Sequence, residues 1–133
     1  MKTGIKWIER DLVLSPVHIG LCLTEKDFEK ELKRLKIPVN ECSPWIPDDK
    51  DGKRWEFQKI KNAHEQCCIV CIRRNRKHTK EEIIGLIIHE SVHVWQSIKE
   101  IIGETNPSPE FEAYSIQTIA QKLITAYNKR EES

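Results

Sequence analysis

The pattern of apolar and polar positions predicts an extended or irregular N-terminal segment followed by a helix. Residues 1–23 mix apolar and charged positions around Gly20 without a helical period, so we expect little helix there. Thr24 and Asp27 then have a spacing that resembles a capping box, in which a side chain satisfies the backbone of the first helical turn. Apolar residues recur at helical spacing beyond this point, which predicts a helix over 24–36.

The middle of the chain predicts a surface loop and a β-hairpin. Residues 38–54 combine prolines with a cluster of aspartates, a composition typical of loops. Two β-prone stretches, 54–60 and 67–73, follow and are separated by a polar segment. This arrangement is the pattern of a hairpin.

Two long helices are predicted in the last part of the chain. Thr79 and Glu82 form a second capping box, and a strongly apolar helix continues from there until Gly103, which is placed to stop it. Pro109 begins the last helix. The expected architecture is α+β, with a small antiparallel sheet or hairpin packed on the central helix and the last helix crossing it.

Length and charge narrow the classes of protein that fit. A chain of 133 residues with 38% hydrophobic and 32% charged residues fits one folded domain over 1–133 and excludes collagen and low-complexity chains. The formal net charge of +1 provides no general field for nucleic acid or an anionic membrane. A nucleic-acid interface would rest on the charge run from Arg73 to Lys80, which fits a solvated turn.

The sequence also predicts the cellular location of the protein. The N-terminus carries charges where a secretory signal needs an apolar stretch, and the longest aliphatic run, from Ile83 to Ile88, is too short to span a bilayer. We therefore expect a soluble cytoplasmic protein with no membrane partner. The sequence does not determine the oligomeric state.

Five cysteines in such a chain are expected to be reduced thiols in the core. Cys68 and Cys71 have C-x-x-C spacing, which can indicate zinc. In a strand, however, positions i and i+3 point to opposite faces, and the chain has no second such pair. A zinc ribbon is therefore not favoured.

The central helix carries the sequence His89-Glu90-Ser91-Val92-His93, which has the pattern H-E-x-x-H. Residues i and i+4 of a helix lie on one face, so both imidazoles can reach one metal ion with Glu90 beside them. The alternative is a chance match in which both histidines are satisfied core residues. The apolar flanks argue for a metal, because burying these polar groups without a partner costs several kcal/mol.

Catalytic zinc requires a third protein ligand and one open position. The last helix offers Glu110 and Glu112 near its start. At about 100° per residue, Glu112 shares the stripe of Ile116 and Ile119 that must face the core, whereas Glu110 points to the opposite side. Glu112 is therefore the better candidate for the third ligand.

The remaining histidines and the tyrosines have ordinary interpretations. His64 is expected in the hairpin turn, and His18 and His78 are expected in loops, as surface residues. Tyr114 and Tyr127 could donate to an oxyanion, but on the last helix we expect them to be packing residues.

The segments HESVHVWQ and GETNPSPEFEAYSIQTIAQ resemble the short H-E-x-x-H proteins encoded by tailed bacteriophages and prophages, which belong with the zincin-like, gluzincin-type metallopeptidases. The resemblance is strongest over 79–127. It implies a zinc site with His89, His93 and Glu112 as ligands and Glu90 as the catalytic acid and base. Regulatory zincins of mobile elements that cleave repressors are more distantly similar, although this chain lacks the helix-turn-helix module that some of them carry.

The predicted function is zinc-dependent hydrolysis of peptide bonds in a peptide or protein substrate, in the host bacterial cytoplasm if the chain is phage-encoded. The alternative is a non-catalytic regulatory or interaction module of phage origin that zinc stabilises. Glu90 favours the enzyme, because a structural zinc site has no use for a general base, although its carboxylate could instead contact a zinc ligand.

Overall fold

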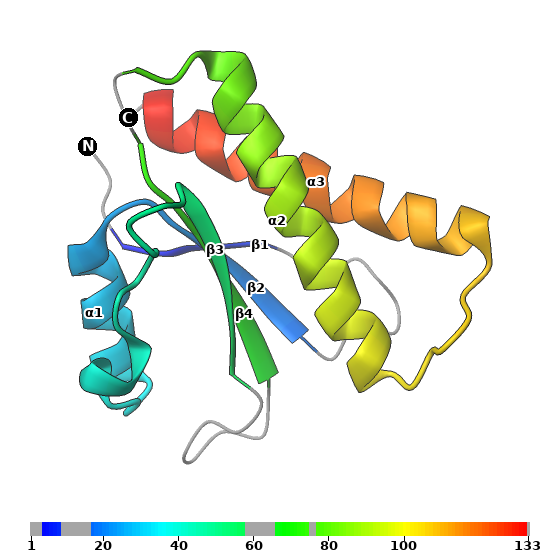
Figure 1. Ribbon diagram of the computed structural model, residues 1–133, viewed down its shortest axis with the longest axis horizontal. Helices are drawn as coiled ribbons and strands as arrows, with labels where there is room; N and C mark the ends of the chain where they lie inside the picture. Colours follow the sequence, from blue (N-terminus) through cyan, green and yellow to red (C-terminus); the bar gives the residue numbers. More distant parts are fainter. Residues whose placement is uncertain (1–3, 9–16, 58–65, 75–76, 133) are drawn as a thin grey trace.

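The centre of the protein is a four-stranded mixed sheet (Figure 1). The computed structural model describes residues 4–8, 17–57, 66–74 and 77–132. The strands lie in the order β1 (Lys6–Ile8), β2 (Val17–Cys22), β4 (Gln66–Ile72) and β3 (Gly52–Phe57). β2 and β4 run parallel, while the two outer pairs are antiparallel.

The sheet differs in part from the expected one. The hairpin pairing of β3 with β4 is confirmed, but the prediction of a purely antiparallel sheet is wrong because β2 joins β4 in parallel. A parallel pair needs a crossover connection, and the helix after β2 lies within that connection. The hairpin connection, with His64, lies outside the described residues.

Three helices and a short 3-10 turn complete the fold, namely α1 (Glu25–Arg34), η1 (Val39–Cys42), α2 (Lys80–Ile101) and α3 (Pro109–Glu132). The predicted caps are confirmed: Thr24 and Thr79 each accept a hydrogen bond from the first turn, and Glu82 completes the capping box of α2. Gly103, which follows α2, has φ +73°, a conformation that favours glycine.

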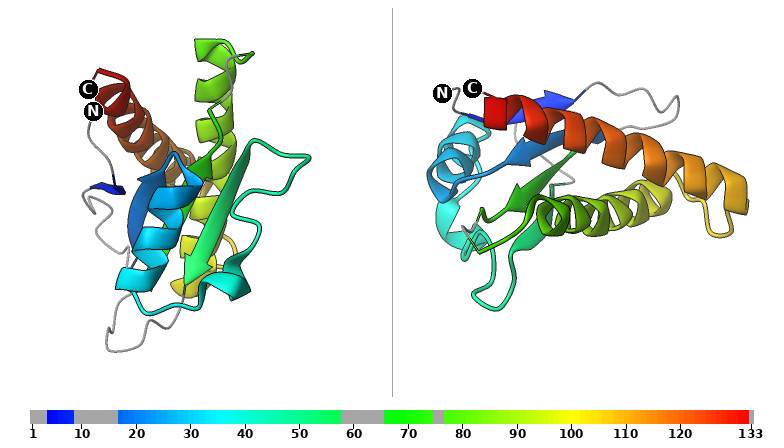
Figure 2. Two further views of the ribbon diagram at one scale, coloured as in Figure 1. Left: turned by 90° about the vertical axis from the view of Figure 1, so that its left-hand side faces the viewer. Right: turned by 90° about the horizontal axis from the view of Figure 1, so that it is seen from above.

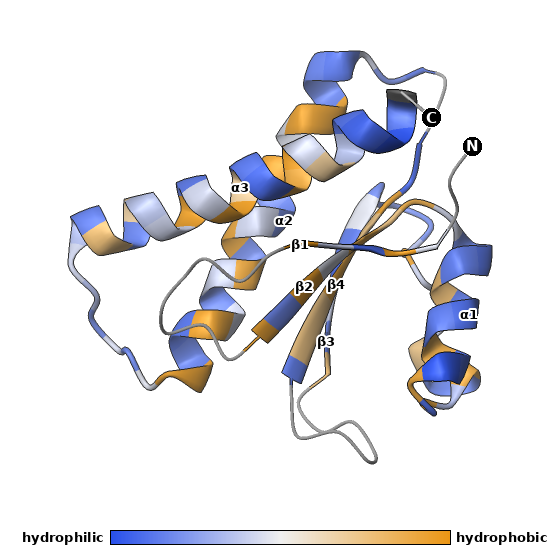
Figure 3. Cartoon of the chain, turned by 180° about the vertical axis from the view of Figure 1, so that it is seen from behind, coloured by the Kyte–Doolittle hydropathy of each residue, from blue (hydrophilic) through white to orange (hydrophobic). Residues whose placement is uncertain are grey.

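The helices cover opposite faces of the sheet (Figure 2). One face packs on α1 through a core that includes Phe28 and Leu32, and the other packs on α2 and α3 through a core that includes Trp95 and Leu123. Figure 3 shows hydrophobic residues gathered where α3 passes α2, while the C-terminal end of α3 is hydrophilic. Among the described helices, none combines the length and apolarity needed to cross a membrane.

The cysteines occupy the core, as the sequence predicts. All five are free thiols with buried side chains. Cys68 packs in the core beneath α2, and Cys71 packs in the core beneath α1. Their opposite orientation excludes a shared metal ion on this strand.

Candidate metal centre

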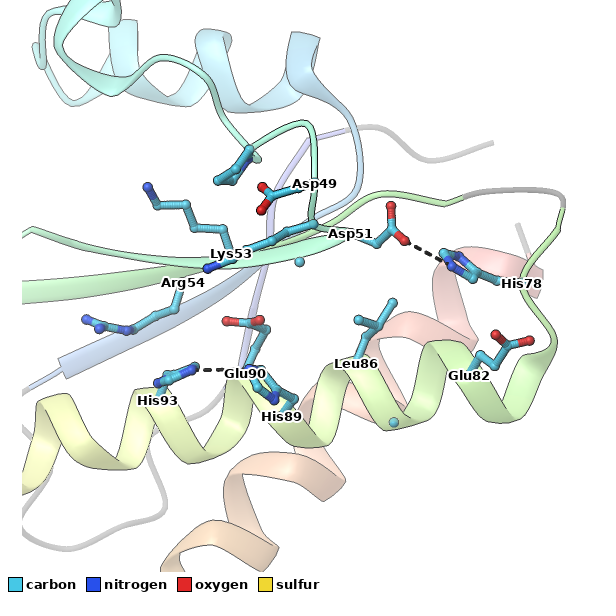
Figure 4. A pocket seen from close by; sticks show the side chains of 14 residues that line it. Asp49, Asp51, Lys53, Arg54, His78, Glu82, Leu86, His89, Glu90 and His93 are labelled. Atoms are coloured by element: carbon cyan, nitrogen blue, oxygen red, sulfur yellow. Dashed lines mark hydrogen bonds and ion pairs between the residues drawn. The ribbon is translucent and has the colours of Figure 1, made fainter.

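The three residues of the helical motif lie on the side of α2 that faces β3 (Figure 4). His89 is exposed, His93 is half-buried and Glu90 is buried with only 4% of its surface accessible. Figure 4 shows Glu90 pointing from α2 toward the strand, with the two imidazoles beside it. The motif is therefore arranged around one small volume between helix and strand.

The two imidazoles have the spacing of metal ligands. The Nε2 atoms of His89 and His93 are 3.2 Å apart, and the ring centroids are 4.9 Å apart at an interplanar angle of 74°. Two nitrogen ligands at about 2.0–2.1 Å from a tetrahedral zinc ion lie about 3.3 Å from one another. In this structure the contact is a hydrogen bond between the two rings, and the same separation is that of two nitrogens bound to one zinc ion.

A second contact, with Gln96, favours one tautomer of His93. Its Nδ1 lies 2.9 Å from Oε1 of Gln96, one turn further along α2. Because the amide oxygen can only accept, Nδ1 carries the hydrogen and the lone pair is left on Nε2. Histidines that bind metals commonly donate their other ring N–H in this way. Gln96 therefore prepares His93 for a metal on the side where His89 lies.

Glu90 lies directly beneath the start of β3. A Cβ atom added at Gly52 would lie 3.1 Å from Oε2 of Glu90, so the missing side chain makes room for the carboxylate. Burial raises the pKa of Glu90, while the positive charges of His89, His93 and Arg54 act in the opposite direction. The site therefore holds a base that binds its proton more tightly than an exposed glutamate.

A pocket of about 760 Å³ opens over the motif. One wall is α2, with Leu86 beside the motif, and the other is the start of β3 and the loop before it. The sequence did not predict the individual residues of this second wall, which are Pro47, Asp49, Lys50, Asp51, Gly52, Lys53 and Arg54. The pocket is large enough for a few residues of a peptide.

His78 closes one end of this pocket. Its Nε2 lies 3.0 Å from Oδ2 of Asp51, and only 16% of its side chain is exposed. The prediction of a surface histidine is therefore wrong. The sequence placed His78 correctly between the strand and α2, but the approach of the loop that buries it has no local signal.

The structure does not bring Glu112 to the histidines. Its Oε2 accepts a hydrogen bond of 2.8 Å from Trp95 Nε1 and lies 3.8 Å from Nζ of Lys99. Trp95 lies two residues after His93 and hence about 200° around the helix. Among the described residues, no three His, Cys, Asp or Glu side chains are arranged to hold a metal ion. Glu112 as the third ligand stays a prediction.

The inward orientation inferred for Glu112 is visible in the structure. Glu112 is half-buried against α2, whereas Glu110 is exposed.

Tyr127 is buried, as expected for packing, but the prediction of packing is wrong for Tyr114, which is 63% exposed. His18 lies in β2 with its ring nearly perpendicular to that of Trp7, so its predicted loop position is also wrong.

The described part of the basic run makes structural contacts. Arg73 donates to the carbonyl of Ile46 at 3.0 Å, and Arg74 pairs with Glu131 at 2.6 Å. These contacts hold the run against the loop before β3 and the end of α3. The two guanidinium groups are thus engaged within the chain.

Comparisons with protein-family models, curated proteins and solved structures gave no match to this chain. The functional argument consequently depends on the geometry of its own residues.

Proposed function

We propose that the protein is a zinc-dependent hydrolase that cleaves peptide bonds in the pocket between α2 and β3. The observation that carries the proposal is the 3.2 Å separation of the His89 and His93 Nε2 atoms next to the buried carboxylate of Glu90. A structural metal site needs only ligands, whereas this site also places an ionisable acid in an open pocket.

The chain's residues have distinct roles in this proposal. His89 and His93 hold the metal. Glu112 is the proposed third ligand, a role that requires its carboxylate to leave Trp95 and move around α2 toward the histidines. Bound zinc would supply a Lewis acid that polarises an amide carbonyl and makes a water molecule more acidic. Glu90 accepts the proton of the attacking water and transfers it to the leaving amine. The raised pKa of Glu90 suits the second step, because its protonated form persists to higher pH.

The alternative of a zinc-stabilised module without catalysis has one observation in its favour. The carboxylate of Glu112 is already engaged by Trp95 and is not directed to the histidines. With only His89 and His93 as protein ligands, a metal would be bound weakly, and its main effect would be to stabilise α2. The two proposals differ in whether Glu90 matters for turnover.

The decisive experiment compares Glu90→Gln with Glu100→Gln, an exposed glutamate on the same helix. Zinc content and melting temperature are measured together with cleavage of an unbiased peptide mixture, followed by mass spectrometry. Glu90→Gln should keep zinc and fold and lose about 10²-fold or more in rate, because the amide cannot accept the proton. Glu100→Gln should match the unmodified protein.

Two results would contradict the enzyme. One is a zinc-loaded protein that cleaves no peptide in the mixture, which favours the module. The other is cleavage that persists in both Glu90→Gln and His89→Ala, which would place the activity elsewhere or in a contaminant.

A further inference from the structure

Arg54 connects the edge strand to the helix of the candidate metal centre. Its Nη1 donates to Oγ of Ser97 at 2.6 Å and to Oε1 of Glu56 at 3.0 Å. Ser97 in turn lies 3.3 Å from the carbonyl of His93, to which its hydroxyl can donate. The guanidinium is therefore fixed in position near His93, as Figure 4 shows.

One nitrogen of this guanidinium is left without an acceptor. The Nε of Arg54 is buried and, within the described part of the chain, has no hydrogen-bond partner. Nε and Nη2 together form a planar fork that matches the two oxygens of a carboxylate. Arg34 uses this same fork in the same protein, with Nε 2.8 Å from one oxygen of Glu31 and Nη2 bonded to the other.

Charges along the pocket are unevenly distributed. Arg54 lies on the His93 side of Glu90, whereas Asp51 and Glu82 lie toward the opposite end (Figure 4). Asp51 is paired with His78, and the cation of Lys53 lies 3.9 Å above the ring of Trp55. Because Nη1 of Arg54 is already paired with Glu56, a negatively charged group is favoured at the Arg54 end through the unpartnered Nε of this guanidinium.

We propose that Arg54 is a specificity-determining residue that binds a carboxylate of the peptide substrate on the His93 side of the pocket. The inference rests on the proposed function for the identity of the ligand as a peptide. The carboxylate belongs to the C-terminus or to an acidic side chain, since both present the same two oxygens. Because Nε is covered in this structure, binding requires the side chains around it to move and expose its N–H to the carboxylate.

The test measures binding and requires no hydrolysis. Metal-free, isotope-labelled protein is titrated with three acetylated pentapeptides of otherwise neutral sequence: one with a free C-terminus, one amidated, and one amidated with an internal glutamate. The unmodified protein should bind at least one carboxylate peptide about tenfold more tightly than the neutral amide, and the Arg54 Nε–H resonance should shift. The stronger of the two acidic peptides identifies the source of the carboxylate.

Variants distinguish a specific contact with Arg54 from a general attraction between the peptide and the positive charges of the protein. Arg54→Gln should bind the three peptides within about twofold of one another, while Arg74→Gln, the same change at an arginine that does not line the pocket and pairs with Glu131, should keep the full preference. Arg54→Lys should keep only part of it, because an ammonium cannot form the fork. If Arg54→Gln fails to fold, Arg54→Lys and the Nε–H shift of the unmodified protein decide the question.

The inference is overturned if the unmodified protein does not prefer a carboxylate, or if folded Arg54→Gln keeps the preference. Hydrolysis enters none of these measurements. A protein that prefers carboxylates and cleaves nothing would therefore reject the peptidase and retain the role of Arg54.

Discussion

The indole N–H of Trp95 donates a 2.8 Å hydrogen bond to the carboxylate of Glu112 and thereby joins the two longest helices. Trp95 is 1% exposed, so its N–H depends on this acceptor for satisfaction. Glu112 consequently has a structural role in the metal-free chain as well as its proposed role as a ligand. The two roles can be separated by substitution.

In metal-free protein, Glu112→Ala should lower the free energy of unfolding by about 1–3 kcal/mol, because it leaves the buried Trp95 N–H without an acceptor. Glu112→Gln keeps a carbonyl oxygen at this place and should cost much less. Glu110→Ala, the exposed neighbour, should cost at most a few tenths of a kcal/mol. Chemical denaturation of the three variants measures these differences.

Zinc titration of the same variants tests the ligand. Both Glu112 variants should bind zinc more weakly than the unmodified protein, and Glu110→Ala should bind it equally well. Unchanged zinc affinity in Glu112→Gln would remove Glu112 from the proposed site and leave a place for another ligand.

The contact between Gln96 and His93 gives a second prediction. Gln96→Ala removes the acceptor that holds the Nδ1 hydrogen, so the ring becomes free to rotate and to change tautomer. We expect zinc affinity to fall by about 10- to 100-fold with little change in the stability of the metal-free protein, since Gln96 is exposed. Competition with a chromogenic chelator measures the affinity, and equal affinity would show that the contact does not orient the ligand.

The local elements could be predicted because their signals are local. Thr79 and Glu82 are three residues apart, so a capping box is visible in the sequence, and the structure confirms it. The segment 1–23 was predicted to be extended or irregular, and β1 and β2 are extended, but the composition around Gly20 did not identify them as strands of the sheet. In the structure, a Cβ at Gly20 would lie 2.7 Å from Ile5 and 3.0 Å from Trp7, so this glycine makes room for the neighbouring strand.

In the candidate site, too, only the relations between residues close in sequence could be predicted. His89, Glu90 and His93 could be predicted to lie together, because they fall within five consecutive residues of one helix. Arg54 and Gly52 could not, because their approach to α2 depends on the register of β3 with β4 and on the loop before it. The helical periodicity correctly predicted that Glu112 faces α2. It could not determine which side of α2 the carboxylate contacts.

The thiols provide a prediction that concerns pH. Burial raises the pKa of both Cys67 and Cys68 to about 12 from the usual 9.0, so neither thiol should react with Ellman's reagent at pH 8 in the folded protein. A pKa raised on folding contributes stability that is complete below the unfolded value of 9.0 and is lost as the pH rises toward about 12. All five thiols should react once denaturant is added, and fast reaction of Cys67 or Cys68 without denaturant would contradict this environment.

The close approach of Gly52 to Glu90 leads to the last prediction. In Gly52→Ala, the new methyl group would lie 3.1 Å from Oε2 of Glu90 and 3.4 Å from Cδ1 of Ile72. Ile72 belongs to the core, so the carboxylate must shift while the strand keeps its place. A base displaced by a few tenths of an ångström should lower peptide cleavage by about tenfold or more, while zinc affinity stays within about twofold, because neither imidazole is touched.

Gly85→Ala is the matched control, because Gly85 also lines the pocket, lies on α2 and has no heavy atom within 4 Å of an added Cβ. Alanine in the middle of a helix should raise the free energy of unfolding by about 0.5–1 kcal/mol relative to glycine and should leave zinc affinity unchanged. Cleavage assays and zinc titrations on both variants, with thermal unfolding to check the fold, complete the comparison. If Gly52→Ala cleaves peptides as fast as the unmodified protein while folding normally, the position of Glu90 beneath β3 is not what sets the rate, and the carboxylate's role as the base would need another geometry.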